Sequence, residues 1–233
     1  MTGRAATLDP HPARAACGRR VGRALLSSLY RASVLDADKV PASGPVLLAS
    51  NHTGVLDGPL IFGLSPRPAH FLVKTEMFHG PVGWVLDACG QIPIDRSHAD
   101  RRALQQAVAV LARGGAVGVF PEGARGLGDV AAVRAGVTWL ALASGAPVVP
   151  IACLGTRSPG AGIGRPPAPG RRVAVVFGDP VRLSAPEGLP RREVHRQQTE
   201  RLRLVLAAHV VESSRRTGIP LTRPLRTHLE EAS

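Results

Sequence analysis

The chain has 233 residues, a length that fits one domain, and its hydrophobic fraction of 44% can support a core. Its formal net charge of +12 predicts attraction to a polyanion, yet the sequence carries neither zinc-finger spacing nor an aromatic–basic platform, so no specific nucleic-acid partner is expected. The three cysteines have no metal-ligand or redox spacing, which argues against a disulfide framework and favours a reducing, cytoplasmic setting.

The first 40 residues divide into two expected segments. Residues 1–17 lack the apolar core of a secretory signal and are expected to be disordered. Residues 18–40 are expected to form an N-terminal amphipathic helix, helical over 18–35, in which Val21, Leu25 and Leu29 recur every four residues among arginines. Two interpretations stay open: the helix rests in a lipid interface, or it packs on the domain with solvated arginines.

From residue 46 onward, short apolar runs alternate with helical patterns. Strands are expected at 46–50, 69–73, 91–94, 116–120, 147–152 and 173–177, and helices at 57–64, 78–88, 99–113, 131–144 and 191–216. This alternation predicts an α/β fold: a single domain over 41–216 with a mixed, mostly parallel sheet flanked by helices, and a tail at 217–233. The most apolar region, 137–154, fits a buried helix followed by a buried strand better than a transmembrane span.

The first chemically informative motif is Asn51-His52-Thr53-Gly54-Val55-Leu56-Asp57, which follows the expected strand at 46–50. Histidine moves protons near neutral pH, and a carboxylate on one ring nitrogen orients it and stabilises the imidazolium. On a regular helix these two side chains would lie roughly 140° apart, so the pair requires a tight turn, which the glycine permits. A helix-capping Asp57 beside an incidental His52 is the alternative.

Four further segments follow in the chain. Lys74-Thr75-Glu76 and Gly90-Gln91-Ile92-Pro93-Ile94-Asp95-Arg96 precede Phe120-Pro121-Glu122-Gly123-Ala124-Arg125-Gly126, and Ala146-Pro147-Val148-Val149-Pro150-Ile151 comes last. An arginine in such a turn matches a phosphate or carboxylate bidentately. In their order and spacing, these blocks over residues 40–160 resemble the glycerolipid acyltransferase family, whose best-known members are 1-acylglycerol-3-phosphate acyltransferases.

The resemblance implies a role for each matching position. His52 matches the family's general base and Asp57 its orienting carboxylate. The residues expected to surround the phosphate of the acyl acceptor are Arg96, Glu122, Gly123 and Arg125. Glu122 either orders that site or touches substrate, and Lys74 either joins it or lies on the surface. Asn51, or backbone N–H groups near Gly54, are candidates for stabilising the oxyanion. The family commonly has threonine and serine where this chain has Ala124 and Gly126, which puts the acceptor's head group in question.

The expected function is acyl transfer from a thioester, acyl-CoA or acyl carrier protein, to the hydroxyl of a lysophospholipid. The expected acceptor is 1-acylglycerol-3-phosphate, giving phosphatidate, with no metal and no cofactor besides the co-substrate. The protein is expected to bind an anionic membrane peripherally at the inner face of the cell membrane. The alternatives are a thioester or phosphoester hydrolase that uses the same dyad with water, and a non-catalytic membrane-binding relative.

Overall fold

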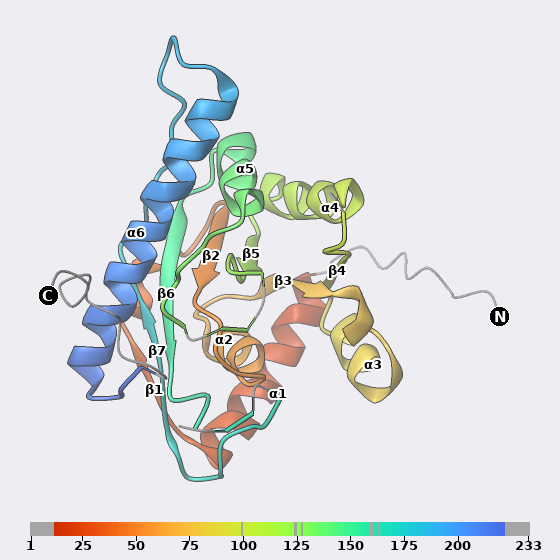
Figure 1. The fold of residues 1–233 in the computed structure, drawn as a ribbon. Helices are drawn as coiled ribbons and strands as arrows, with labels where there is room; N and C mark the ends of the chain where they lie inside the picture. Colours follow the sequence, from red (N-terminus) through yellow and green to blue (C-terminus); the bar gives the residue numbers. More distant parts are fainter. Residues whose placement is uncertain are drawn as a thin grey trace, which may run out of the picture.

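The computed structural model describes residues 12–221 apart from 99, 124, 127, 159, 160 and 163. It is an α/β fold built on a seven-stranded sheet with strand order β1-β7-β6-β2-β5-β3-β4 (Figure 1). The strands are β1 (Arg31–Leu35), β2 (Val46–Ser50), β3 (Ala69–Lys74), β4 (Ile92–Ile94), β5 (Ala116–Val119), β6 (Val148–Leu154) and β7 (Arg172–Phe177). Neighbouring strands run parallel except β6 and β7, which confirms the expected mixed, mostly parallel sheet.

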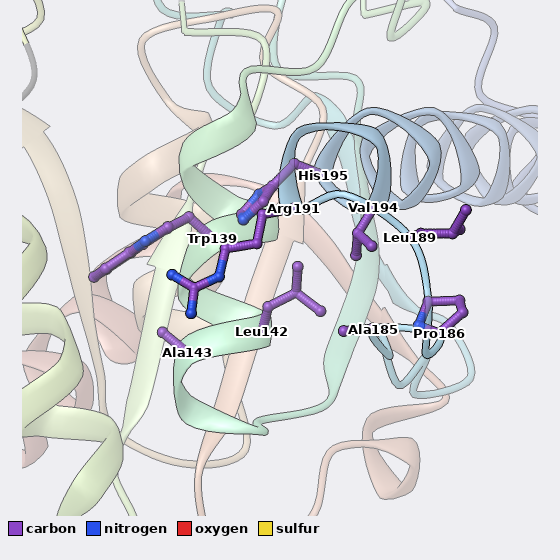
Figure 2. A pocket seen from close by; sticks show the side chains of 9 residues that line it. All are labelled: Trp139, Leu142, Ala143, Ala185, Pro186, Leu189, Arg191, Val194 and His195. Carbon is purple, nitrogen blue, oxygen red and sulfur yellow. The ribbon is translucent and has the colours of Figure 1, made fainter.

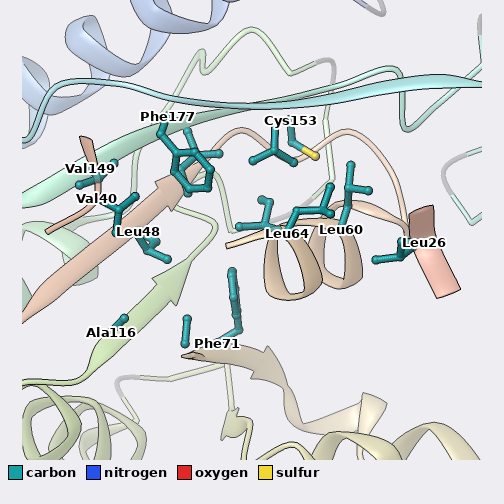
Figure 3. Packing of buried hydrophobic residues seen from close by; sticks show 14 of the residues in the cluster. Leu26, Val40, Leu48, Leu60, Leu64, Phe71, Ala116, Val149, Cys153 and Phe177 are labelled. Atoms are coloured by element: carbon teal, nitrogen blue, oxygen red, sulfur yellow. The ribbon is translucent and has the colours of Figure 1, made fainter. Parts of the chain in front are cut away.

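Helices cover both faces of this sheet. The helices are α1 (Pro12–Leu29), α2 (Asp57–Leu64), α3 (Gly80–Ala88), α4 (Arg101–Ala112), α5 (Ala135–Ser144) and α6 (Arg191–Thr217), with 3-10 turns at Ala37–Lys39 and Thr75–Met77. Side chains alternate across a strand, so Leu48 of β2 packs with α1 and α2, whereas Leu47 packs with α4 and α5. Figure 3 shows the first of these two clusters. The central strands are therefore continuous apolar runs, as buried parallel strands require.

The N-terminal region differs from the expectation in two ways. Residues 12–17 belong to α1 and are not disordered, while residues 1–11 lie outside the described part of the chain. The helix ends at Leu29, and Arg31–Leu35 is a strand that pairs with β7, not the last turns of a helix. Neither glycine nor proline marks the boundary in the sequence, so the change rests on tertiary contacts. Tyr30 is buried there, and its hydroxyl donates to the carbonyl of Pro167 at 3.2 Å.

Helix α1 has one face on the domain and one face in solvent. Leu26 is buried against α2, where the two helix backbones approach closely: a Cβ placed on Gly63 would lie 3.1 Å from the backbone of Gly22. On the other side Val21, Leu25 and Leu29 are 64%, 56% and 40% exposed. Helix α1 therefore packs on the domain and still presents the predicted apolar stripe to solvent.

Within the described residues, no helix combines the length and the apolar character needed to cross a membrane.

Candidate active site

The motifs meet at one edge of the sheet, where several parallel strands end. His52 follows β2, Arg96 follows β4 and Glu122 follows β5. Thr156 follows β6, which is parallel to β2. Ligands in open α/β sheets bind outside the carboxyl ends of the strands, so this edge is the expected place for a site.

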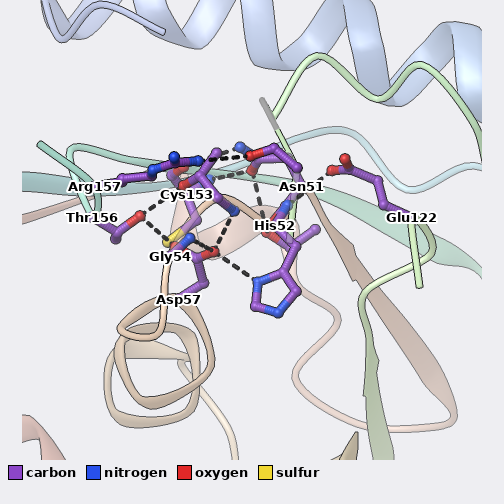
Figure 4. Close-up of polar contacts among 11 residues, drawn as sticks. Asn51, His52, Gly54, Asp57, Glu122, Cys153, Thr156 and Arg157 are labelled. Atoms are coloured by element: carbon purple, nitrogen blue, oxygen red, sulfur yellow. Dashed lines mark hydrogen bonds and ion pairs between the residues drawn. The ribbon is translucent and has the colours of Figure 1, made fainter. Parts of the chain in front are cut away.

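His52 and Asp57 form a close pair. The Nδ1 atom of His52 lies 2.8 Å from Oδ2 of Asp57 (Figure 4). The residues between them make a turn, and α2 begins only at Asp57, so the tight turn that the sequence required is present. Gly54 is needed in that turn because a Cβ there would lie 2.8 Å from the carbonyl oxygen of Thr156.

Asp57 is fully buried, and every close partner is a donor. Its Oδ2 accepts the backbone N–H of Thr53 at 2.6 Å and that of Gly54 at 2.8 Å, while its Oδ1 accepts the hydroxyl of Thr156. Charge-assisted hydrogen bonds of this kind offset the cost of removing a carboxylate from water. They also fix the carboxylate against His52. Asp57 lies in the first turn of α2, whose N-cap is Leu56, and it contacts His52; that the two act as a catalytic dyad stays a prediction.

The imidazole ring of His52 is held on a second side by an aromatic contact. It stacks on Phe120 with ring centroids 4.1 Å apart and planes 20° apart. A carboxylate accepts hydrogen bonds, so Nδ1 is the donor in this contact, and in a neutral ring Nε2 then carries the lone pair. Figure 4 shows the ring's other nitrogen turned away from the polar groups drawn around it. Nε2 can therefore accept a proton from a ligand.

The backbone of His52 is held by the turn after β5. Its N–H donates to Oε1 of Glu122 at 2.9 Å, and its carbonyl accepts the N–H of Gly126 at 2.8 Å. Burial raises the pKa of Glu122 to about 7, against the lowering effect of the His52 N–H. The structure thus places Glu122 on the main chain of the histidine, which ties the first motif to the third.

The side chain of Asn51 connects two strands of the sheet. Its side chain is buried, accepts the N–H of Cys153 at 2.8 Å and donates to the carbonyl of Cys153 at 3.1 Å. Both ends of the amide are therefore used between β2 and β6. The N–H of Gly54, the other oxyanion candidate, is used by Asp57. The amide thus joins β2 to β6 with its oxygen and one of its two N–H donors, and a role of Asn51 in substrate binding stays a prediction.

Arginines gather beside this dyad. Nη1 of Arg96 donates to the carbonyl of Gly123 at 2.5 Å, and Arg125 is half-buried two residues further along. Burial lowers the pKa of Arg96, and the positive charges of Arg134 and Arg125 lower it further. Lys74, in contrast, lies on the surface and pairs with Glu76 at 2.7 Å. This is the second of the two positions expected for it.

From the sequence, no role was assigned to three residues of this site, Phe120, Arg134 and Thr156. Phe120 and Thr156 each lie within two residues of a strand end, the position that the other site residues share. Arg134 precedes α5 and carried no such signal. Among the described residues, no group of three His, Cys, Asp or Glu side chains could hold a metal ion. The absence of a cofactor stays a prediction.

A separate hollow lies between α5 and the residues that lead into α6 (Figure 2). Its lining is mainly apolar, with Trp139, Leu142 and Leu189, and its polar members are Arg191 and His195. None of the motif residues lines it, so the dyad's edge of the sheet is the candidate active site.

Comparisons with known proteins agree with this geometry. The family model described as Acyltransferase matches residues 31–154, a stretch that contains the dyad and the arginine motifs. A 1-acyl-sn-glycerol-3-phosphate acyltransferase of Chlamydomonas reinhardtii is 37% identical over 136 residues, which cover 55% of this chain and 40% of that protein. A lyso-ornithine lipid O-acyltransferase of Pseudomonas aeruginosa is 37% identical over 81 residues, covering 34% of this chain and 31% of the relative.

The fold has a solved counterpart as well. The crystal structure of the 1-acyl-sn-glycerophosphate acyltransferase PlsC from Thermotoga maritima matches with a TM-score of 0.59 and 25% identity, covering 87% of this chain and 78% of that one. The chain spans less than half the length of the two curated relatives it matches above.

Proposed function

Because this chain belongs to the Acyltransferase family, we propose that it transfers an acyl group from a thioester donor to the hydroxyl of a lysophospholipid. The proposed acceptor is 1-acylglycerol-3-phosphate, and the product is phosphatidate. The observation that carries the proposal is the 2.8 Å contact between Nδ1 of His52 and Asp57, which leaves Nε2 facing away from the carboxylate at the carboxyl edge of the sheet. The names of the algal relative and of the structural match support the choice of acceptor.

In the proposed reaction, His52 acts as the general base. Nε2 takes the proton of the acceptor hydroxyl while that oxygen attacks the thioester carbonyl. The tetrahedral intermediate then expels the thiolate, which takes the proton from the imidazolium, so the new C–O ester bond replaces the C–S bond. Asp57 stabilises the imidazolium through Nδ1 and keeps its own charge throughout. General-base catalysis of this kind contributes about 10²–10⁴-fold.

The arginines beside the dyad support a phosphate-bearing acceptor. Arg96 and Arg125 would hold the head group, since a guanidinium fork matches phosphate oxygens. The relative that acylates lyso-ornithine lipid argues for testing a phosphate-free acceptor too. That acceptor leaves the arginine charges without a counter-ion, so we favour the phosphate.

Membrane association is part of the proposal. The exposed stripe of α1 contains Val21, Leu25 and Leu29, and arginines lie around it without an acidic residue in the helix. Such a helix lies in a lipid interface with its apolar face inserted and its cations near anionic lipid. A lipid acceptor would then reach the site from the membrane surface, at the cytoplasmic side.

The experiment offers the protein one labelled acyl-CoA, or the matching acyl carrier protein, with a panel of lysolipids. The panel contains lysophosphatidate, lysophosphatidylglycerol and lyso-ornithine lipid, and products are separated by mass. We expect phosphatidate, formed only when lysophosphatidate is present. Release of free thiol at the same rate without any acceptor would show a hydrolase instead. If neither an acylated product nor free thiol formed, the protein would be a non-catalytic relative.

A further inference from the structure

Two guanidinium groups meet at Gly123, and a third arginine lies two residues away in the chain. Nη1 of Arg96 donates to the carbonyl of Gly123 at 2.5 Å. Arg134 lies against the same residue, because a Cβ built on Gly123 would be 2.1 Å from its Nε. Arg125 is two residues from Gly123, and the charges of both other arginines act on Arg96. Gly123 adopts a φ of 74°, which glycine allows at little cost.

Within the part of the chain that the structure describes, these three arginines have no acidic partner. Among the described residues, no carboxylate forms an ion pair with Arg96, Arg125 or Arg134. Glu76, whose charge acts on Arg96, is itself paired with Lys74 at 2.7 Å. Like charges that close together repel each other unless an anion lies between them.

Arg134 is also held in place by its backbone. Its N–H donates to the carbonyl of Pro121 at 2.8 Å, which fixes the start of α5 against the turn after β5. The backbone of Arg134 is therefore fixed beside the turn that contains Gly123, although the residue lies in a different segment from the motif arginines. A phosphomonoester carries a charge of about −1.5 to −2 at pH 7, whereas a phosphodiester carries one negative charge.

We propose that Arg134 completes, with Arg96 and Arg125, a binding site for a phosphomonoester dianion, and that Arg134 makes the site select a monoester over a diester. The inference rests on the proposed function, because it deepens the acceptor assignment. Two substrates of that reaction carry a phosphomonoester: the head group of lysophosphatidate and the 3′-phosphate of coenzyme A. The shared chemistry is the dianion, and the experiment separates the two sources.

The test is calorimetric titration of the full chain at pH 8, without turnover. The ligands are glycerol 3-phosphate, the diester glycerophosphoglycerol, CoA and dephospho-CoA. The variants are Arg134→Gln and Arg134→Lys, and the matched control is Arg192→Gln, an exposed arginine in the first turn of α6. Circular dichroism shows that each variant is folded.

We expect Arg134→Gln to lower the affinity for glycerol 3-phosphate about tenfold, which is the cost of one charge-assisted hydrogen bond. The affinity for the diester should change far less. Arg134→Lys should recover part of the loss, and Arg192→Gln should bind like the wild type. If the loss falls on CoA but not on dephospho-CoA, the monoester is that of the donor. Equal losses for monoester and diester, or no loss with any ligand, would overturn the proposal. If the wild-type protein did not transfer acyl groups, the proposed function would be refuted. The binding of monoester and diester ligands could still be compared between wild type and variants, because that measurement does not need turnover.

Discussion

Replacing Glu122 with glutamine should remove a pH-dependent loss of stability. Burial raises the pKa of this carboxyl from 4.5 to about 7, so the folded state favours its protonated form. The stability that the proton provides is present below pH 4.5, the ordinary value, and is lost as the pH rises through 7. The full shift corresponds to roughly 3 kcal/mol, and partial exposure of the side chain reduces our expectation to about 1–2 kcal/mol.

The assay is denaturant unfolding of wild type and Glu122→Gln at pH 5 and pH 8. The amide keeps an oxygen for the N–H of His52, which the carboxylate accepts at 2.9 Å, but it cannot ionise. The wild type should therefore lose about 1–2 kcal/mol more than the variant between the two pH values. Identical pH dependence of the two proteins would show that Glu122 titrates near its ordinary pKa and would refute the reasoning.

Glu122→Ala is the matched control. It removes both the charge and the acceptor, so the half-buried N–H of His52 loses its partner, at a cost of about 1 kcal/mol at both pH values. Because the glutamine keeps the contact that positions His52, Glu122→Gln should retain turnover better than Glu122→Ala. Equal turnover of the two variants would show that the contact with Glu122 does not position His52 for catalysis.

Four further outcomes are expected. His52→Ala should lower turnover by about 10²–10⁴-fold with an unchanged circular dichroism spectrum, and near-normal turnover would exclude His52 as the base. Thr156→Val removes a donor from buried Asp57 and should cost about 1–3 kcal/mol in urea unfolding, whereas Thr156→Ser should cost clearly less. Arg125→Lys should raise the apparent KM for the lysolipid more than that for the acyl donor, and the reverse order would place Arg125 on the donor side. Leu25→Ser should weaken co-sedimentation with anionic vesicles more than Leu204→Ser, a control at a similar 54% exposure on α6, and equal effects would move the membrane contact away from α1.

The sequence was most informative where the local pattern determines the structure. The apolar run before Asn51 and the glycine at 54 predicted a strand and a tight turn, and both are present at those residues. The end of α1 was mispredicted because nothing local stops the helix before Arg31. Pairing with β7, about 140 residues further along the chain, decides that boundary.

The site was predictable only in part for the same reason. His52 and Asp57 lie in one short segment, so their spacing carries the information. The contact that holds the side chain of Asn51 was not predicted, because its partner, Cys153, lies 102 residues away in the sequence. Thr156 and Arg134 likewise reach the site through the sheet topology. Their roles follow from which strand ends meet, which a single sequence does not state.

The close approach of α1 to α2 has a mechanical consequence. Gly63 of α2 lies against the backbone of α1, and Asp57 begins the same short helix six residues earlier, about 9 Å along its axis. If α1 lies in a bilayer surface, as proposed, the short and rigid helix α2 sets the distance between the acyl chains and the His52–Asp57 pair. The height at which the base meets a glycerol hydroxyl is then determined by helix geometry. Bulkier side chains at the crossing would raise or tilt the dyad relative to the lipid.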